Sequence, residues 1–181
     1  IRTGNRIAVN YPDLGKYLLS GMVSGLLCRF TFHDEAPWLI VGPSLVLAVM
    51  ILMAGRFVSG IIPRKNLFGP LMLFLCCAIG WFLAFEHGVK TVRGHDIWLV
   101  ECGFIGGLSV GIGLSFAWRQ ITAWVILVHT TVAGVLGGSI GMLWERITDL
   151  DFPLFVFWQG ILLLGTGIAV QVDSKMQSAK G

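Results

Sequence analysis

Long apolar runs alternate along this chain with short stretches of charged and polar residues. Each apolar run is close to the length of about 20 residues that a helix needs to cross the hydrocarbon core of a bilayer. Six such runs are present: Lys16–Phe32, Trp38–Gly55, Leu67–Phe85, Ile97–Trp118, Ile121–Trp144 and Pro153–Val172. The pattern therefore predicts an all-α, polytopic membrane protein with six transmembrane helices, of which the first, short and carrying Arg29, is the least typical.

The order of the runs predicts one transmembrane domain built from three helical hairpins, at about 16–56, 66–119 and 121–175. Tryptophan recurs every sixty residues, at or just inside the start of the second helix of each hairpin, at Trp38, Trp98 and Trp158. The simplest interpretation is an internal triplication of one hairpin. The alternative is chance, because tryptophan collects at membrane interfaces in any case.

Composition supports the membrane assignment and limits what else the chain can contain. Hydrophobic residues make up 55% of the chain and charged residues only 13%, about half the charged fraction of a typical soluble protein. The runs take up most of the 181 residues, which leaves no room for a separate soluble catalytic domain.

Charge is distributed unevenly between the two faces of the predicted bundle. Nine of the thirteen basic residues lie on one side, which predicts cytoplasmic termini by the positive-inside rule: Arg2, Arg6, Lys16, Arg56, Arg64, Lys65, Arg119, Lys175 and Lys180. Eight of the ten acidic residues lie at or near the other face: Asp34, Glu35, Glu86, Asp96, Glu101, Glu145, Asp149 and Asp151. These acids either form an outer rim that concentrates cations or protons, or simply occupy the side that basic residues avoid.

One hairpin carries a family resemblance. It begins with a tryptophan and small residues, turns at an acidic, proline-containing tip and returns through G-I-x-L-L-x-G, in the stretch WVILVHTTVAGVLGGSIGMLWERITDLDFPLFVFWQGILLLGTGIAV at 124–170. This pattern resembles the repeat of HdeD-like membrane proteins. The resemblance implies a six-helix bacterial inner-membrane protein associated with stress, and it implies no catalytic or binding residues.

Small residues recur along several predicted helices at spacings that place them on one face. Such stripes allow helix backbones to approach closely in lipid. The fourth predicted helix carries Cys102, Gly106, Ser109 and Gly113, and the fifth carries Thr130, Gly134, Gly137 and Gly141. The first predicted helix carries a shorter stripe of Gly21, Gly25 and Cys28. We expect the fourth and fifth helices to pack on each other or on equivalent neighbours.

Ionisable groups within a bilayer are costly and therefore mark candidate sites. Glu101 lies three residues beyond Trp98, about 5 Å below the interface, where it can take up a proton or a cation from the outer side. The alternative is a structural acid bonded to a loop or to Arg29, Arg93 or Arg146.

His129 is the other ionisable residue deep within a predicted helix. It lies about 12 Å from Glu101 in depth, so proton handling would require a relay. The alternative is a neutral histidine that donates to an oxygen atom of another helix.

Other chemistries lack a matching pattern. The remaining histidines lie at helix ends or in loops, and neither they nor the four cysteines have the spacing of a haem, zinc or other metal site. Ser109 has no histidine in the last apolar run to act as its base, which argues against an intramembrane serine enzyme. We therefore expect no cofactor, no metal, no nucleic-acid partner and no catalytic residue.

These observations favour a protein that moves, or helps to move, a small solute, ion or proton, with Arg29, Glu101 and His129 as the candidate groups. The alternative is a non-catalytic subunit that docks other membrane chains, or further copies of itself, through its glycine and tryptophan surfaces.

Overall fold

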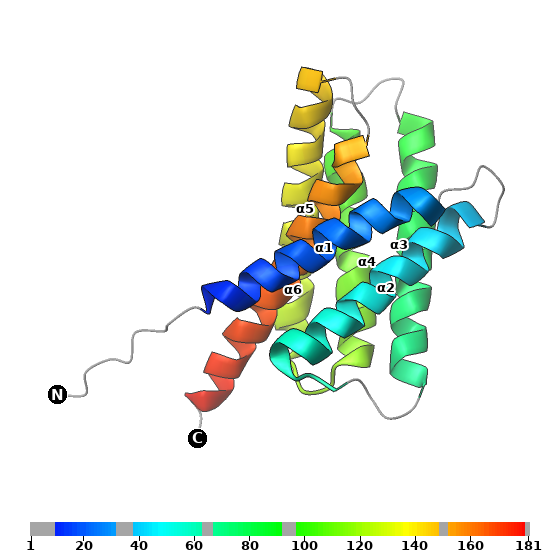
Figure 1. Cartoon of the computed structure of the whole chain (residues 1–181). Helices are drawn as coiled ribbons and strands as arrows, with labels where there is room; N and C mark the ends of the chain where they lie inside the picture. Colours follow the sequence, from blue (N-terminus) through cyan, green and yellow to red (C-terminus); the bar gives the residue numbers. More distant parts are fainter. Residues whose placement is uncertain (1–9, 32–37, 63–66, 92–96, 149–151, 180–181) are drawn as a thin grey trace.

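The computed structural model of the chain describes residues 10–31, 38–62, 67–91, 97–148 and 152–179, and within these ranges it contains α-helices and no β-strand. Six helices follow one another (Figure 1): α1 (Tyr11–Thr31), α2 (Trp38–Ser59), α3 (Phe68–Thr91), α4 (Trp98–Ala117), α5 (Ala123–Thr148) and α6 (Phe152–Ser178). The predicted all-α fold and its six helices are confirmed.

Several helices extend beyond the apolar runs that predicted them. α1 begins at Tyr11 instead of Lys16, and α3 continues to Thr91 instead of ending near Phe85. The apolar run reflects the thickness of the hydrocarbon core. A helix can continue into the headgroup layer, because each added residue still satisfies its own backbone hydrogen bonds.

Helices α2 to α6 are long and apolar enough to cross a membrane, so the chain is an integral membrane protein. Among the described residues α1 does not meet the same condition. Its first half carries Asp13, Lys16 and Ser20, whose polarity dilutes the apolar character of its second half. The predicted six crossings are thus supported for five helices.

Neighbours in the sequence are also neighbours in space, and α1 completes the arrangement by packing along α6. Figure 1 shows α1 and α2 inclined across the steeper α3, α4 and α5. The most extensive helix contact joins α4 to α5, which belong to two different predicted hairpins. The contacts therefore do not single out three hairpins as separate units. α2 and α4 begin at Trp38 and Trp98, but α6 begins six residues before Trp158, and the triplication stays a prediction.

Both described ends of the chain lie at the same end of the bundle (Figure 1), which we call the terminal end. The backbone N–H of Asn10 donates to Oε1 of Gln171 at 3.2 Å, and Nε2 of Gln171 donates to the Asn10 carbonyl at 2.9 Å. The start of α1 is therefore fixed to the last third of α6. The other end of the bundle is called the opposite end.

A buried carboxylate organises the terminal end. Asp173 of α6 is 2% exposed, and its Oδ1 accepts a hydrogen bond of 3.1 Å from the backbone N–H of Thr122, immediately before α5. Its Oδ2 accepts a bond of 2.6 Å from Gln177. Asp173 thus satisfies a free N–H at the start of α5, as an N-cap residue does, but from another helix.

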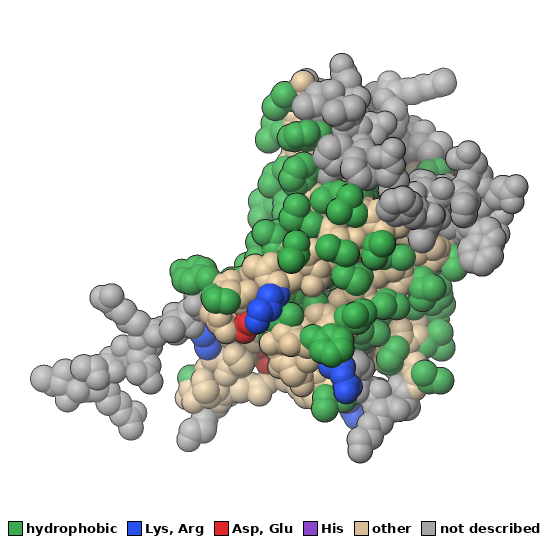
Figure 2. Space-filling model, in the orientation of Figure 1, with side chains coloured by type: hydrophobic (Ala, Val, Ile, Leu, Met, Phe, Trp, Pro, Cys, Tyr) green, Lys and Arg blue, Asp and Glu red, His purple; other side chains and the backbone are tan. Residues whose placement is uncertain are grey.

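Large apolar side chains lie exposed across much of the face of the bundle that Figure 2 shows. On α5 they recur every four residues and are 43–54% exposed: Trp124, Val128, Val132, Leu136 and Ile140. A continuous apolar stripe on a spanning helix is the surface expected to contact lipid.

Candidate functional site

The opposite end of the bundle holds a carboxylate–imidazole pair between two helices. His87 lies near the end of α3 and Glu101 lies in the first turn of α4. Nε2 of His87 and Oε2 of Glu101 are 2.6 Å apart, and the two side chains are 33% and 37% exposed. The pair is therefore accessible from outside the bundle while it joins α3 to α4.

Close packing of α3 and α4 positions this pair. A Cβ atom at Gly80 of α3 would lie 2.7 Å from Oγ of Ser109, and one at Gly113 of α4 would lie 2.9 Å from Cα of Leu73. Beside the pair, the Cys102 thiol donates to the carbonyl of Ala84 at 3.1 Å. The missing side chains let the two helices approach, and their antiparallel course brings the end of α3 to the start of α4.

The pair combines an imidazole and a carboxylate, two ionisable groups. Histidine changes its charge more readily near neutral pH than other side chains, and a hydrogen bond strengthens when either partner carries charge. The two side chains can therefore form a strong hydrogen bond that joins α3 to α4.

Sequence reasoning found Glu101 but missed His87 as its partner. The partners considered were arginines, but Arg93 lies outside the described residues, and the side chains of Arg29 and Arg146 are not described. A signal for His87 was available. It lies near the end of one apolar run and Glu101 near the start of the next, so a tight antiparallel pair of helices places them at the same end.

The predicted acidic rim can be followed at two positions only. The side chains of Glu86 and Glu101 are described, and both are partly buried near the opposite end. The Glu145 side chain is not described, and the other acids lie outside the described residues: Asp34, Glu35, Asp96, Asp149 and Asp151. The rim as a whole stays a prediction.

His129 bonds within its own helix. Its Nδ1 donates to the carbonyl of Val125, one turn earlier in α5, at 2.8 Å. The alternative given for His129 was a bond to an oxygen atom of another helix, and this bond stays within α5. The contacts of Leu99 with Gly138 and of Gly107 with Thr130 set the register of α4 against α5. In that register Glu101 is level with residue 136 of α5, so His129 lies about seven residues, or roughly 10 Å along the helix axis, from the level of Glu101.

The contact between α4 and α5 uses a different set of glycines on α4 from the predicted stripe. A Cβ atom at Gly103 would overlap the carbonyl of Gly134, and one at Gly107 would overlap the carbonyl of Thr130. Gly111 packs on the Thr130 side chain. The signal that sequence reasoning missed is the regular spacing of four in Gly103, Gly107 and Gly111.

The predicted α4 stripe faces other neighbours. Cys102, Ser109 and Gly113 lie against α3, and Gly106 packs on the ring of Trp158 in α6.

The small residues predicted on the other two helices do lie at helix contacts. In α5, Thr130 and Gly134 face α4, and Gly137 faces Trp158; Gly141 is buried. In α1, a Cβ atom at Gly25 would lie 2.6 Å from Cα of Val156, and Gly21 meets the backbone of Gln159 and Gly160 in α6.

A second polar cluster lies buried between α1 and α6. Gln159 is fully buried, and its Nε2 donates to Sγ of Cys28 at 3.2 Å. Cys28 in turn is 3.7 Å from the Pro43 carbonyl of α2. Oε1 of Gln159 and Oγ of the fully buried Ser24 have no hydrogen-bond partner in the described part of the chain. Sequence reasoning placed Cys28 in the small-residue stripe of the first helix but did not consider Ser24 or Gln159, because it looked for ionisable groups.

Within the described ranges no group of three histidine, cysteine or acidic side chains is arranged to hold a metal ion. The chain matches no protein-family model, no curated protein and no solved structure.

Proposed function

We propose that this chain is a six-crossing membrane protein that moves, or assists the movement of, a small solute, ion or proton. The observation that carries the proposal is the His87–Glu101 hydrogen bond at the opposite end of the bundle. Ionisable residues within membrane-spanning helices are rare and are candidate functional sites by default. A partly exposed pair is suited to exchange a proton or cation with the surrounding water.

The contacts of α1 favour a sixth crossing. Asn10, just before α1, bonds to Gln171 at the terminal end of α6, and Gly25 meets Phe155 near the other end of α6. α1 therefore runs along some sixteen residues of a spanning helix, roughly 24 Å of its axis. Burial against α6 lets α1 cross with less apolar sequence than a lipid-exposed helix needs.

We place the terminal end in the cytoplasm. Lys16, Arg56, Arg119 and Lys175 lie near this end, where α1 begins and α2, α4 and α6 finish, and basic residues favour the cytoplasmic side. In Figure 2, the visible Lys and Arg side chains lie towards the terminal end. The HdeD-like spacing of 124–170 supports a bacterial inner-membrane protein associated with stress, and the triplication belongs to the same proposal.

The second candidate is a non-catalytic subunit of a larger membrane assembly. Its favouring observation is the exposed apolar stripe on α5, which can contact another chain as well as lipid. The glycines that such a subunit would use for docking are engaged inside this chain, between α4 and α5 and between α1 and α6. This internal use of the small residues makes transport the better supported of the two.

Flux through liposomes that contain the purified protein tests the proposal. Proton flux is followed with an internal pH-sensitive dye and cation flux with ion-selective electrodes. Glu101→Gln keeps the size of the side chain but loses its charge, and we expect it to lower flux about tenfold, the effect of losing one charged hydrogen bond. Asp13→Asn makes the same chemical change at the terminal end and should leave flux unchanged.

Unchanged flux in the Glu101→Gln variant, at normal protein level, would remove Glu101 from the mechanism. No flux of any tested ion, together with stable co-purification of other membrane chains, would favour the subunit role instead.

A further inference from the structure

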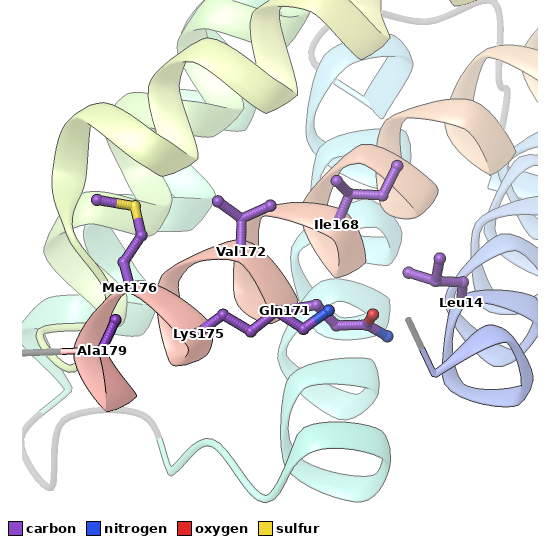
Figure 3. A pocket seen from close by; sticks show the side chains of 7 residues that line it. All are labelled: Leu14, Ile168, Gln171, Val172, Lys175, Met176 and Ala179. Atoms are coloured by element: carbon purple, nitrogen blue, oxygen red, sulfur yellow. The ribbon is translucent and has the colours of Figure 1, made fainter. Parts of the chain in front are cut away.

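A groove of about 350 Å³ lies at the terminal end, between the start of α1 and the last turns of α6. Figure 3 shows its lining: Leu14 from α1, and Ile168, Gln171, Val172, Lys175, Met176 and Ala179 from α6 or directly after it. Five of these seven side chains are apolar, so the groove suits a hydrocarbon chain better than a polar solute.

The two polar side chains of the lining differ in what they are free to bind. Both amide atoms of Gln171 are engaged with the backbone of Asn10. Lys175 forms no ion pair with any carboxylate of the described residues. The nearby Asp173 is buried and already accepts bonds from Thr122 and Gln177. The groove therefore carries one positive charge available for an anion.

The position of Lys175 fixes the level of that charge in the membrane. It lies in the last turn of α6, whose spanning segment extends to Ser178. A lysine near the end of a spanning helix places its ammonium group among the lipid headgroups while its stem lies along apolar surface. The groove then extends from headgroup level into the level of the acyl chains.

We propose that this groove binds one acyl chain of an anionic phospholipid, with the headgroup phosphate on Lys175. Charge complementarity selects this occupant: the end of the bundle that carries the groove also carries Arg56 and Arg119, and basic residues at a membrane surface attract anionic lipid. The site would hold lipid whether or not the protein transports a solute.

Native mass spectrometry of the purified protein tests the site, after exposure to vesicles of phosphatidylglycerol or of phosphatidylcholine with the same acyl chains. The wild-type chain should retain phosphatidylglycerol preferentially. Lys175→Gln should lower this retention roughly fivefold, the value of one lysine at an anionic surface. Lys16→Gln is the matched control, because Lys16 lies in α1 near the same end and is bonded to Asp13 at 2.9 Å; its retention should match the wild type.

A second variant tests the contribution of the apolar groove separately from that of the Lys175 charge. Ile168→Trp should fill the groove and reduce retention although Lys175 is intact. Equal loss in the two lysine variants would indicate general surface charge and overturn the site, as would equal retention of the two lipids or an unaffected Ile168→Trp variant.

Discussion

Single polar residues inside the bundle differ in how well their hydrogen-bonding groups are satisfied. Buried Thr130 and Thr166 donate to carbonyls one turn earlier in their own helices, at 2.8 and 3.0 Å. Ser24 and Gln159 each leave an oxygen without a partner among the described residues. An unmade buried hydrogen bond costs about 1–3 kcal/mol, so these two residues weaken the contact between α1 and α6.

This cost predicts that removing both polar groups does not destabilise the protein. We expect the double variant Ser24→Ala, Gln159→Leu to be as stable as the wild type or more stable, by up to about 1–3 kcal/mol. Its unfolding midpoint in a denaturing detergent titration measures this. Thr130→Val, which removes a satisfied hydroxyl, is the control and should not increase stability. A clearly less stable double variant would show that Ser24 and Gln159 are satisfied in the membrane.

Helix packing depends on a few positions at which a backbone meets another backbone. Lipid supplies little hydrophobic force between helices, so close contact between small residues is a main source of their attraction. Gly103 and Gly134 each meet the carbonyl of the other, and Gly138 meets the carbonyl of Leu99. Backbone atoms cannot move away by a change of rotamer as a flexible side chain can. Any side chain added at these positions must therefore push the two helices apart.

Gly134→Ala is therefore predicted to destabilise the protein by about 1–3 kcal/mol, the usual cost of overpacking. Thermal unfolding in mild detergent measures the effect. Gly15→Ala is the matched control: it lies in helix α1, and its added Cβ would have no atom of a neighbouring element within 4 Å. We expect the control to be unchanged or more stable by up to about 1 kcal/mol. Equal behaviour of the two variants would contradict the packing described for α4 and α5.

At the scale of the whole molecule, the two ends of the bundle have different characters. At the terminal end, Asp173 and Gln177 of α6 form hydrogen bonds with the backbone of Thr122 and Gln120, just before α5. Nε2 of Gln120 in turn donates to the carbonyl of Ile62, just after α2, at 3.4 Å. The opposite end holds the His87–Glu101 pair. A basic end held together by hydrogen bonds and an opposite end with a partly exposed His87–Glu101 pair agree with a protein that has one fixed orientation in the membrane.

This arrangement predicts that Ser178 and Ile97 face opposite sides of the membrane. Both are exposed, at the terminal and the opposite end respectively. In a variant with its four cysteines replaced, a membrane-impermeant thiol reagent applied to intact cells should label Ile97→Cys. Ser178→Cys should be labelled only after the cells are opened. Labelling of both from the same side would contradict the topology.

The sequence predicted the helices and the membrane well but the contacts between helices only in part. Glu101 and the small residues of α1 and α5 were identified at positions where the structure places a polar pair or close packing. His87 was considered only as a metal ligand, Gln159 was not considered, and the stripe predicted on α4 packs on α3 and α6, while α5 meets a different face of α4. Each of these misses concerns which face of a helix meets which neighbour.

The sequence by itself determined that this chain forms apolar helices in a bilayer, because backbone groups in hydrocarbon must bond within their own segment. Only the tertiary structure decided how each helix is rotated about its axis. α4 carries small residues on more than one face, and periodicity alone does not say which of them meets α5. That rotation places Glu101 beside His87, Gln159 beside Cys28, and Lys175 at the edge of an apolar groove.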